Sequence, residues 1–186
     1  MDSLRECESK LWQLFKQGDD GAFSAIYNQY STRLYYYGLK FTRNRTLIED
    51  TLHDLFYELI RNRKSIGHTD SIFPYLLTSF RRKLFRKLRS ESRYNLNGEQ
   101  EEYEFDVMYS IEHEIILEEH SLRRKDLFAR ALQQLSPRQK EAIYLRFTSE
   151  LEYGEISSIM EMSLEACRNL ICRAIRALKE NLPGDT

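Results

Sequence analysis

The stretch DSIFPYLLTSFRRKLFRKLRSESR, residues 70–93, decides the fold because it predicts one long helix with two chemically different faces. Apolar residues recur at helical spacing on one face, which therefore needs a core: Phe73, Leu77, Phe80, Leu84 and Leu88. Polar, aromatic and basic residues share another face: Tyr75, Ser79, Arg82, Arg86, Arg89 and Arg93. Pro74 fits a helix that starts at Asp70 or Ser71, because N–H groups in a first turn have no intrahelical partner.

The basic face of this predicted helix carries more positive charge than solubility requires. Its Lys and Arg residues crowd together with no acid before Glu91, so they repel one another unless a polyanion neutralises them. Tyr75 adds a ring on which an unpaired base can stack. The alternative is an ordinary solvated face. The density of charge favours a nucleic-acid-binding face.

Charge is segregated along the chain, although the net charge of the 186 residues is only −1. Between Arg61 and Arg93 the only acids are Asp70 and Glu91, whereas residues 95–120 contain many acids and no Lys or Arg. A hydrophobic content of 41% excludes a disordered chain. This pattern predicts a polyanion-binding domain at residues 1–93, an acidic linker at 94–120 and a second domain at 121–186.

The cysteines give no sign of a disulfide framework or a zinc site. Cys7, Cys167 and Cys172 are odd in number and form no CxxC or Cys/His spacing. We find no signal peptide and no apolar run near the length of a membrane span. We therefore expect a cytoplasmic protein with no metal and no cofactor.

The rest of residues 1–93 predicts further helices, because no segment alternates with period two. A short helix is expected at residues 4–16, a second after a cap at Asp19 or Asp20, and a third from the capping-box pair Thr46 and Glu49. The third helix has an unusually wide apolar stripe, which Phe56 and Ile60 extend. That width suggests a second partner; the alternative is another helix of the same domain, which periodicity alone favours.

The carboxy-terminal domain predicts a helix-turn-helix. One helix spans residues 137–147 with Ser136 as its cap, a short helix follows at 152–160, and after a turn a last helix spans 163–181. The outward face of the last helix carries polar side chains suited to base edges in a major groove: Arg168, Asn169, Cys172, Arg173 and Arg176.

These residues together resemble a known family. Residues 18–66 and 73–87 resemble region two, and residues 135–182 resemble region four, of the extracytoplasmic-function group of sigma-70-type factors of bacterial RNA polymerase. The order of the two blocks, with an acidic linker between them, also matches. The resemblance implies an all-α protein of two small helical domains that binds core RNA polymerase, recognises and melts promoter DNA, and is restrained by an anti-sigma factor.

The resemblance also implies three sets of site residues. Those expected on the polymerase clamp coiled coil are Asp50, His53, Asp54, Phe56, Tyr57 and Ile60, where His53 replaces a usual glutamine. Those expected at the minus-ten element are His68, Thr69, Asp70, Ser71, Tyr75, Arg82 and Arg86, where Arg82 replaces a frequent asparagine. Those expected at the minus-thirty-five element are Arg168, Asn169, Cys172, Arg173 and Arg176, the last on phosphates.

Two other classes of function compete with this one. A helix-turn-helix regulator with a helical sensor or partner domain would share the last part of the chain, but it needs no aromatic and basic helix. An enzyme is less compatible, because there is no P-loop and the histidines are scattered. We therefore expect binding without catalysis, and no catalytic residue.

Overall fold

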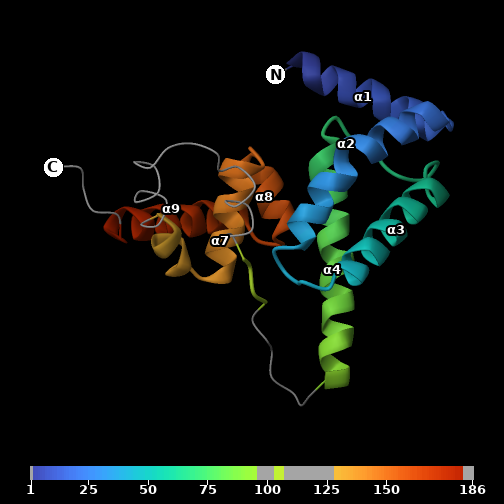
Figure 1. Cartoon of the computed structure of the whole chain (residues 1–186). Helices are drawn as coiled ribbons and strands as arrows, with labels where there is room; N and C mark the ends of the chain where they lie inside the picture. Colours follow the sequence, from blue (N-terminus) through green and yellow to red (C-terminus); the bar gives the residue numbers. More distant parts are fainter. Residues whose placement is uncertain (1, 96–102, 107–127, 182–186) are drawn as a thin grey trace, which may run out of the picture. The chain divides into compact units, whose positions relative to one another are not determined.

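The computed structural model describes residues 2–95, 103–106 and 128–181. All regular secondary structure within these residues is helical, which confirms the predicted all-α fold (Figure 1). The chain divides into two compact units, Met1–Gln100 and Glu101–Thr186, called unit 1 and unit 2 below.

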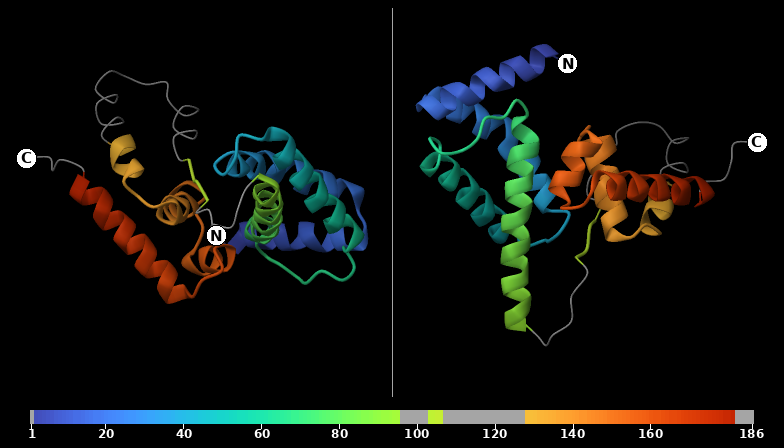
Figure 2. Two further views of the ribbon diagram at one scale, coloured as in Figure 1. Left: turned by 90° about the horizontal axis from the view of Figure 1, so that it is seen from below. Right: turned by 180° about the vertical axis from the view of Figure 1, so that it is seen from behind.

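Unit 1 is built around the predicted long helix. Its helices are α1 (Asp2–Gln17), α2 (Asp20–Gly38), α3 (Arg45–Arg61) and α4 (Ile72–Asn95). Helix α4 packs against each of the other three, most extensively against α3. Figures 1 and 2 show α1 crossing the end of α4 at which the chain enters from α3. The helix that decides the fold in the sequence is therefore also the centre of the packing.

The apolar face of α4 forms the core of unit 1. Phe73, Leu77, Phe80 and Leu84 are buried as predicted, whereas Leu88 is only half-buried. Helix α2 approaches this core closely at Gly38, where a Cβ atom would lie 2.9 Å from Cγ2 of Ile48 and 3.2 Å from the Phe80 ring. A residue without a side chain is needed there because interiors are close-packed.

The helix starts in unit 1 only partly follow the predictions. Asp19 caps α2, its carboxylate accepting the N–H of Ala22 at 2.6 Å. Thr46 was the predicted start of α3, but the cap is Asn44, whose side chain accepts the N–H of Leu47 at 3.1 Å. The prediction at Thr46 is wrong because an equally good capping residue lies just before it.

Unit 2 contains the predicted helix-turn-helix. Residues 128–133 are helical and are followed by α7 (Pro137–Ile143), the π-helix η1 (Tyr144–Thr148), α8 (Tyr153–Ile159) and α9 (Leu164–Asn181). The capping box of Ser136 and Gln139 is present as predicted. The turn between α8 and α9 places Glu161 at a φ of +53°, and Ser163 accepts the N–H of Ala166 to start α9.

Part of the predicted acidic linker belongs to unit 2. Tyr103 donates its hydroxyl to Oε2 of the buried Glu141 at 2.6 Å. Phe105 is 2% exposed, and its ring lies 5.8 Å from that of Tyr144. The many acidic residues around Tyr103 and Phe105 predicted a linker, so the packing of these two aromatic side chains was not expected. Residues 94 and 95 still belong to α4, and residues 96–102 and 107–120 of the predicted linker lie outside the described residues.

Candidate nucleic-acid interface

The basic residues of α4 do not share one environment. Nζ of Lys83 lies 2.5 Å from Glu58, and Nζ of Lys87 lies 2.6 Å from Asp54, both acids of α3. Arg81 is 8% exposed and its guanidinium stacks over the Phe85 ring at 4.4 Å. The prediction that only a polyanion can neutralise the basic residues of α4 is therefore wrong for Lys83 and Lys87. Neighbouring helices already compensate part of the charge.

The outer arginines of α4 are exposed, as the sequence predicts. Arg82, Arg86 and Arg89 are exposed on α4, one or two turns apart on the same surface. The side chain of Arg93 lies outside the described residues. This row of exposed arginines is called the basic face below. It presents cationic groups along a rigid helix, which suits the regular phosphates of a nucleic-acid strand.

Tyr75 is not an open stacking platform. Its ring is half-buried and meets the ring of Trp12 edge-on at a centroid distance of 5.1 Å. Burial also raises the pKa of the Tyr75 phenol above its ordinary value. A base that stacks on the Tyr75 ring therefore contacts a side chain that already packs against Trp12 of α1.

The loop of residues 62–71 leads from α3 into the basic face. His68 and Asp70 are exposed, whereas Thr69 and Ser71 are half-buried. Thr69 folds the end of the loop, since its hydroxyl accepts the N–H of Ser71 at 3.1 Å and donates to the Ser71 carbonyl at 3.0 Å. Four residues expected at the minus-ten element thus lie together at the start of α4.

Helix α1 holds this loop through residues that the sequence analysis did not select. The indole N–H of Trp12 donates to the Gly67 carbonyl at 2.9 Å. Oε2 of Glu8 accepts the N–H of Ile72 at 2.7 Å, so α4 begins at Ile72 instead of Asp70 or Ser71. The only available signal was that Trp12 is the single tryptophan of the chain.

Tyr30 fixes the capping carboxylate in place. Its hydroxyl donates to Oε1 of Glu8 at 2.6 Å. Burial, and next the hydrogen bond to Glu8, raise the pKa of Tyr30, which keeps it a donor. Glu8 is thereby joined to both α2 and α4.

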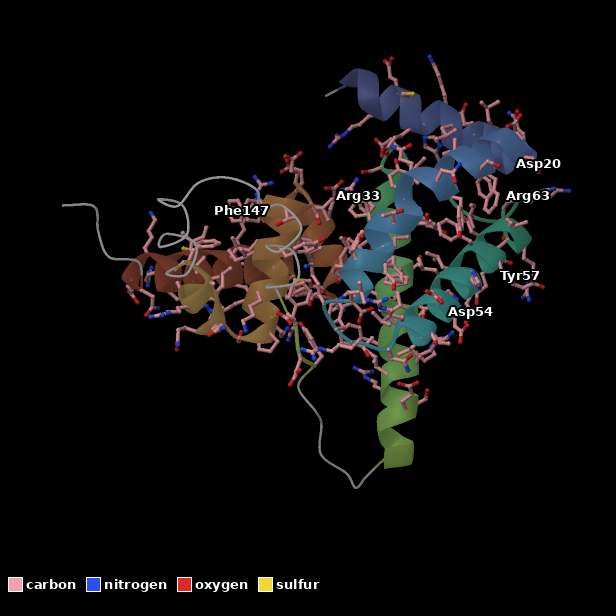
Figure 3. All side chains as sticks on the ribbon, in the orientation of Figure 1. Asp20, Arg33, Asp54, Tyr57, Arg63 and Phe147 are labelled. Atoms are coloured by element: carbon pink, nitrogen blue, oxygen red, sulfur yellow. The ribbon has the colours of Figure 1, made fainter. Side chains whose placement is uncertain are left out.

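The expected polymerase-binding residues of α3 divide into an exposed row and one buried ring. Figure 3 shows Asp54 and Tyr57 extending from α3, and Tyr57 is 65% exposed. Asp50 and His53 are exposed, and Ile60 is 39% exposed. Phe56, however, is 3% exposed, with its ring 4.7 Å from that of Tyr27.

The assignment of Phe56 as a docking residue is therefore corrected. The apolar stripe on α3 is wide because α2 covers Phe56, so another helix of the same unit covers this part of the stripe, as periodicity alone favoured. Ile60, in contrast, remains partly exposed. The exposed row of α3 consists of Asp50, His53, Asp54, Tyr57 and Ile60.

The outward face of α9 has the predicted residues. Arg168, Asn169, Cys172, Arg173 and Arg176 are all exposed, while Cys167, Ile171, Ala174 and Leu178 are buried beneath them. Nε of Arg173 donates to the Asn169 carbonyl at 3.3 Å, which directs its guanidinium along the helix. Burial raises the pKa of the Cys167 thiol, so this residue acts as an apolar core group.

The π-helix before α8 was not predicted. Arg146 donates to the Leu151 carbonyl at 2.8 Å and lies over the Tyr153 ring at 5.0 Å. Phe147, labelled in Figure 3, is 59% exposed.

Among the described residues no cluster of His, Cys, Asp or Glu is arranged to hold a metal ion. No helix in the same part of the chain is long and apolar enough to cross a membrane.

Comparison with known proteins supports the resemblance to sigma factors. A family model described as Sigma-70, region 4 matches residues 125–178, which include the helix-turn-helix. The chain is 26% identical over 194 residues to the ECF RNA polymerase sigma factor BldN of Streptomyces coelicolor, covering 99% of this chain and 68% of that protein. It is also 26% identical to the RNA polymerase sigma factor CarQ of Myxococcus xanthus, covering 90% of this chain and 93% of that protein. The chain is thus similar to sigma factors along most of its length, and its helix-turn-helix matches sigma-70 region 4.

Two solved structures share the fold. The sigma factor RpoE from Bartonella quintana, crystallised with the anti-sigma factor NepR, has a TM-score of 0.59 at 19% identity over 88% of this chain and 98% of that chain. CnrH, solved with the cytosolic domain of CnrY, has a TM-score of 0.59 at 15% identity over 96% of this chain and 99% of that chain. At these identities the likeness concerns the fold alone.

Proposed function

We propose that the chain is a sigma factor of the extracytoplasmic-function group, and that it directs promoter recognition and melting through three surfaces: the face of α9, the loop 62–71 with the basic face of α4, and the exposed row of α3. The observation that carries the proposal is the exposed, polar face of α9 within the segment matched as sigma-70 region four. An exposed helix face with Asn and Arg side chains is suited to contacts with the base edges and phosphates of duplex DNA. The other two surfaces explain why this duplex reader needs a second helical unit.

Helix α9 reads the minus-thirty-five duplex. Asn169 and Arg173 lie one turn apart near the start of the helix, where amide and guanidinium groups make bidentate contacts with adenine and guanine. Arg168 and Cys172 flank them. Arg176 lies further along α9 and contacts phosphate. Base contacts therefore come from residues 168–173 of α9, and the phosphate contact comes from Arg176, closer to the end of the helix.

The loop and the basic face engage the minus-ten element in its melted form. The loop offers polar side chains of His68, Thr69, Asp70 and Ser71 to an unpaired base, while Arg82 and Arg86 follow the backbone of the displaced strand. Tyr75 contributes the side of its ring that is not occupied by Trp12. Capture of a flipped base compensates for part of the cost of unpairing.

The exposed row of α3 docks on core RNA polymerase. Its acids, Asp50 and Asp54, flank an accessible histidine and continue into the exposed apolar surface of Tyr57 and Ile60. An apolar patch with a charged border is typical of a protein interface. An anti-sigma factor that covers these surfaces would prevent both docking and DNA binding. The proposed role requires no catalysis by this chain and takes place in the cytoplasm, where the polymerase acts.

Reconstituted transcription with core polymerase alone tests the proposal. Addition of the purified chain should convert core polymerase from random to promoter-dependent initiation on a pool of genomic fragments. The competing helix-turn-helix regulator would bind its duplex tightly without core polymerase and would give no transcript with core alone. That result would overturn the proposal.

A further inference from the structure

Helix α1 runs along the loop 62–71 and contacts it repeatedly. Trp12, which is fully buried, holds the Gly67 carbonyl, and Oγ of Ser9 lies 3.4 Å from Nε2 of His68. At the end of α1, Gly18 lies directly against the guanidinium of Arg63, which would be 3.2 Å from an added Cβ. The loop is therefore held to α1 at Gly67 and His68, and Gly18, which directly follows α1, lies beside Arg63.

The two halves of the loop are held in different ways. The first half is a turn closed by its own backbone, since the N–H groups of Ser65 and Ile66 both donate to the Asn62 carbonyl. In the second half, Gly67 has open space on the side where a Cβ would lie. Its carbonyl is nevertheless fixed, because Trp12 donates to it from α1.

Glu8 extends the same attachment into α4. Its carboxylate accepts the first N–H of that helix, where the helix dipole favours a negative charge. The other carboxylate oxygen is held by Tyr30 of α2. Trp12 also packs against Tyr75 of α4. A change at Trp12 thus reaches both the loop and the first turn of α4, whereas a change at Glu8 acts on Ile72, where the loop ends and α4 begins.

We infer that Glu8 and Trp12 are positioning residues for minus-ten readout, which rests on the function proposed above for the loop. They touch no DNA in this account. They fix where the polar side chains at residues 68–71 stand relative to α4, and so determine which base the loop accepts. A site must be held to within a fraction of an ångström to discriminate between bases, and a loop alone rarely achieves this.

The test compares Trp12→Phe and Glu8→Gln with Ile48→Val. Trp12→Phe keeps an aromatic ring and removes the N–H, while Glu8→Gln leaves one acceptor oxygen for two donors. Ile48→Val truncates a buried residue near the opposite end of α3 from the loop and controls for general loss of stability. Each holoenzyme is mixed with promoter duplexes randomised over both elements, and the bound DNA is recovered and sequenced.

We expect Trp12→Phe and Glu8→Gln to reduce base preference several-fold at the minus-ten positions and to retain the preference at the minus-thirty-five positions. Ile48→Val should retain both. Unchanged preferences in the two α1 variants would overturn the inference. A parallel loss at both elements would also overturn it, because that result indicates only weakened folding. Absence of any minus-ten preference in the unsubstituted holoenzyme would instead overturn the proposed function, and the inference with it.

Discussion

Lys87 of α4 lies 2.6 Å from the carboxylate of Asp54 on α3, so a residue expected to face the polymerase is already paired within its own unit. Asp54 remains half-exposed, and a paired carboxylate of this kind can still accept hydrogen bonds from a partner. The same salt bridge neutralises one of the lysines for which the sequence predicts a polyanion. The surface proposed to dock on the polymerase and the basic helix proposed to bind DNA therefore share this pair of charges.

Substitution of this pair should separate its two roles. Asp54→Ala and Lys87→Ala should each change the free energy of unfolding by less than about 1 kcal/mol, because exposed ion pairs contribute little. Asp54→Ala should weaken binding to core polymerase, whereas Lys87→Ala should leave it intact. Urea denaturation and a pull-down with core polymerase measure the two effects. Equal weakening by both variants would show that the salt bridge, and not the carboxylate, matters for docking.

Phe56 and Tyr57 are adjacent on α3 but should behave in opposite ways. Phe56→Ala removes a buried ring that contacts Tyr27 and should cost about 3–5 kcal/mol of unfolding free energy. Tyr57→Ala should leave thermal unfolding nearly unchanged and reduce affinity for core polymerase. Differential scanning calorimetry and core binding are the measurements. Full core binding by Tyr57→Ala would remove the exposed row of α3 from the interface.

Tyr103 should stabilise unit 2 although it belongs to the predicted linker. Tyr103→Phe removes the hydroxyl that donates to the buried Glu141 and should cost about 1–3 kcal/mol, the range for an incompletely satisfied buried polar group. Glu104→Ala, at an exposed neighbour, is the matched control and should have little effect. Denaturation of the full chain followed by near-UV circular dichroism compares them. Identical midpoints would show that the hydrogen bond contributes nothing.

Residues of α9 should separate base readout from phosphate binding. Asn169→Ala should cost about 1–3 kcal/mol on the preferred minus-thirty-five duplex and little on a scrambled one. Arg176→Ala should weaken both duplexes alike and reduce the slope of log affinity against log salt by about 0.9 for one lost phosphate contact. Holoenzyme binding at several salt concentrations distinguishes these patterns. If Asn169→Ala weakened both duplexes equally, the residue would have no part in base readout.

The sequence was most informative where the structure depends on periodicity within one helix. The buried face of α4, the cap at Ser136 and the exposed face of α9 all follow from residues three or four apart, so they could be predicted. Periodicity shows that Phe56 faces apolar surroundings, but it does not show whether another helix or a partner provides them.

Contacts between distant segments account for the remaining differences. Glu8 caps a helix 64 residues away, and Trp12 holds a loop 55 residues away, so no local pattern reveals them. Tyr103 was hidden for the same reason, since its partner Glu141 lies in α7, 38 residues further along the chain. For α4 and its loop the predicted element was found, while the residue that holds it came from elsewhere in the chain.

The central claim, that the chain acts as a sigma factor and opens promoter DNA together with core polymerase, is tested most directly by permanganate reactivity of thymines near the start site. Reactivity on a closed duplex should appear only when the chain and core polymerase are both present. It should be reduced strongly by Arg82→Ala with Arg86→Ala, and a template with a pre-melted bubble should restore transcription by that variant. Normal opening by the double variant would contradict the role of the basic face, and no reactivity with the unsubstituted chain and core polymerase would contradict the account as a whole.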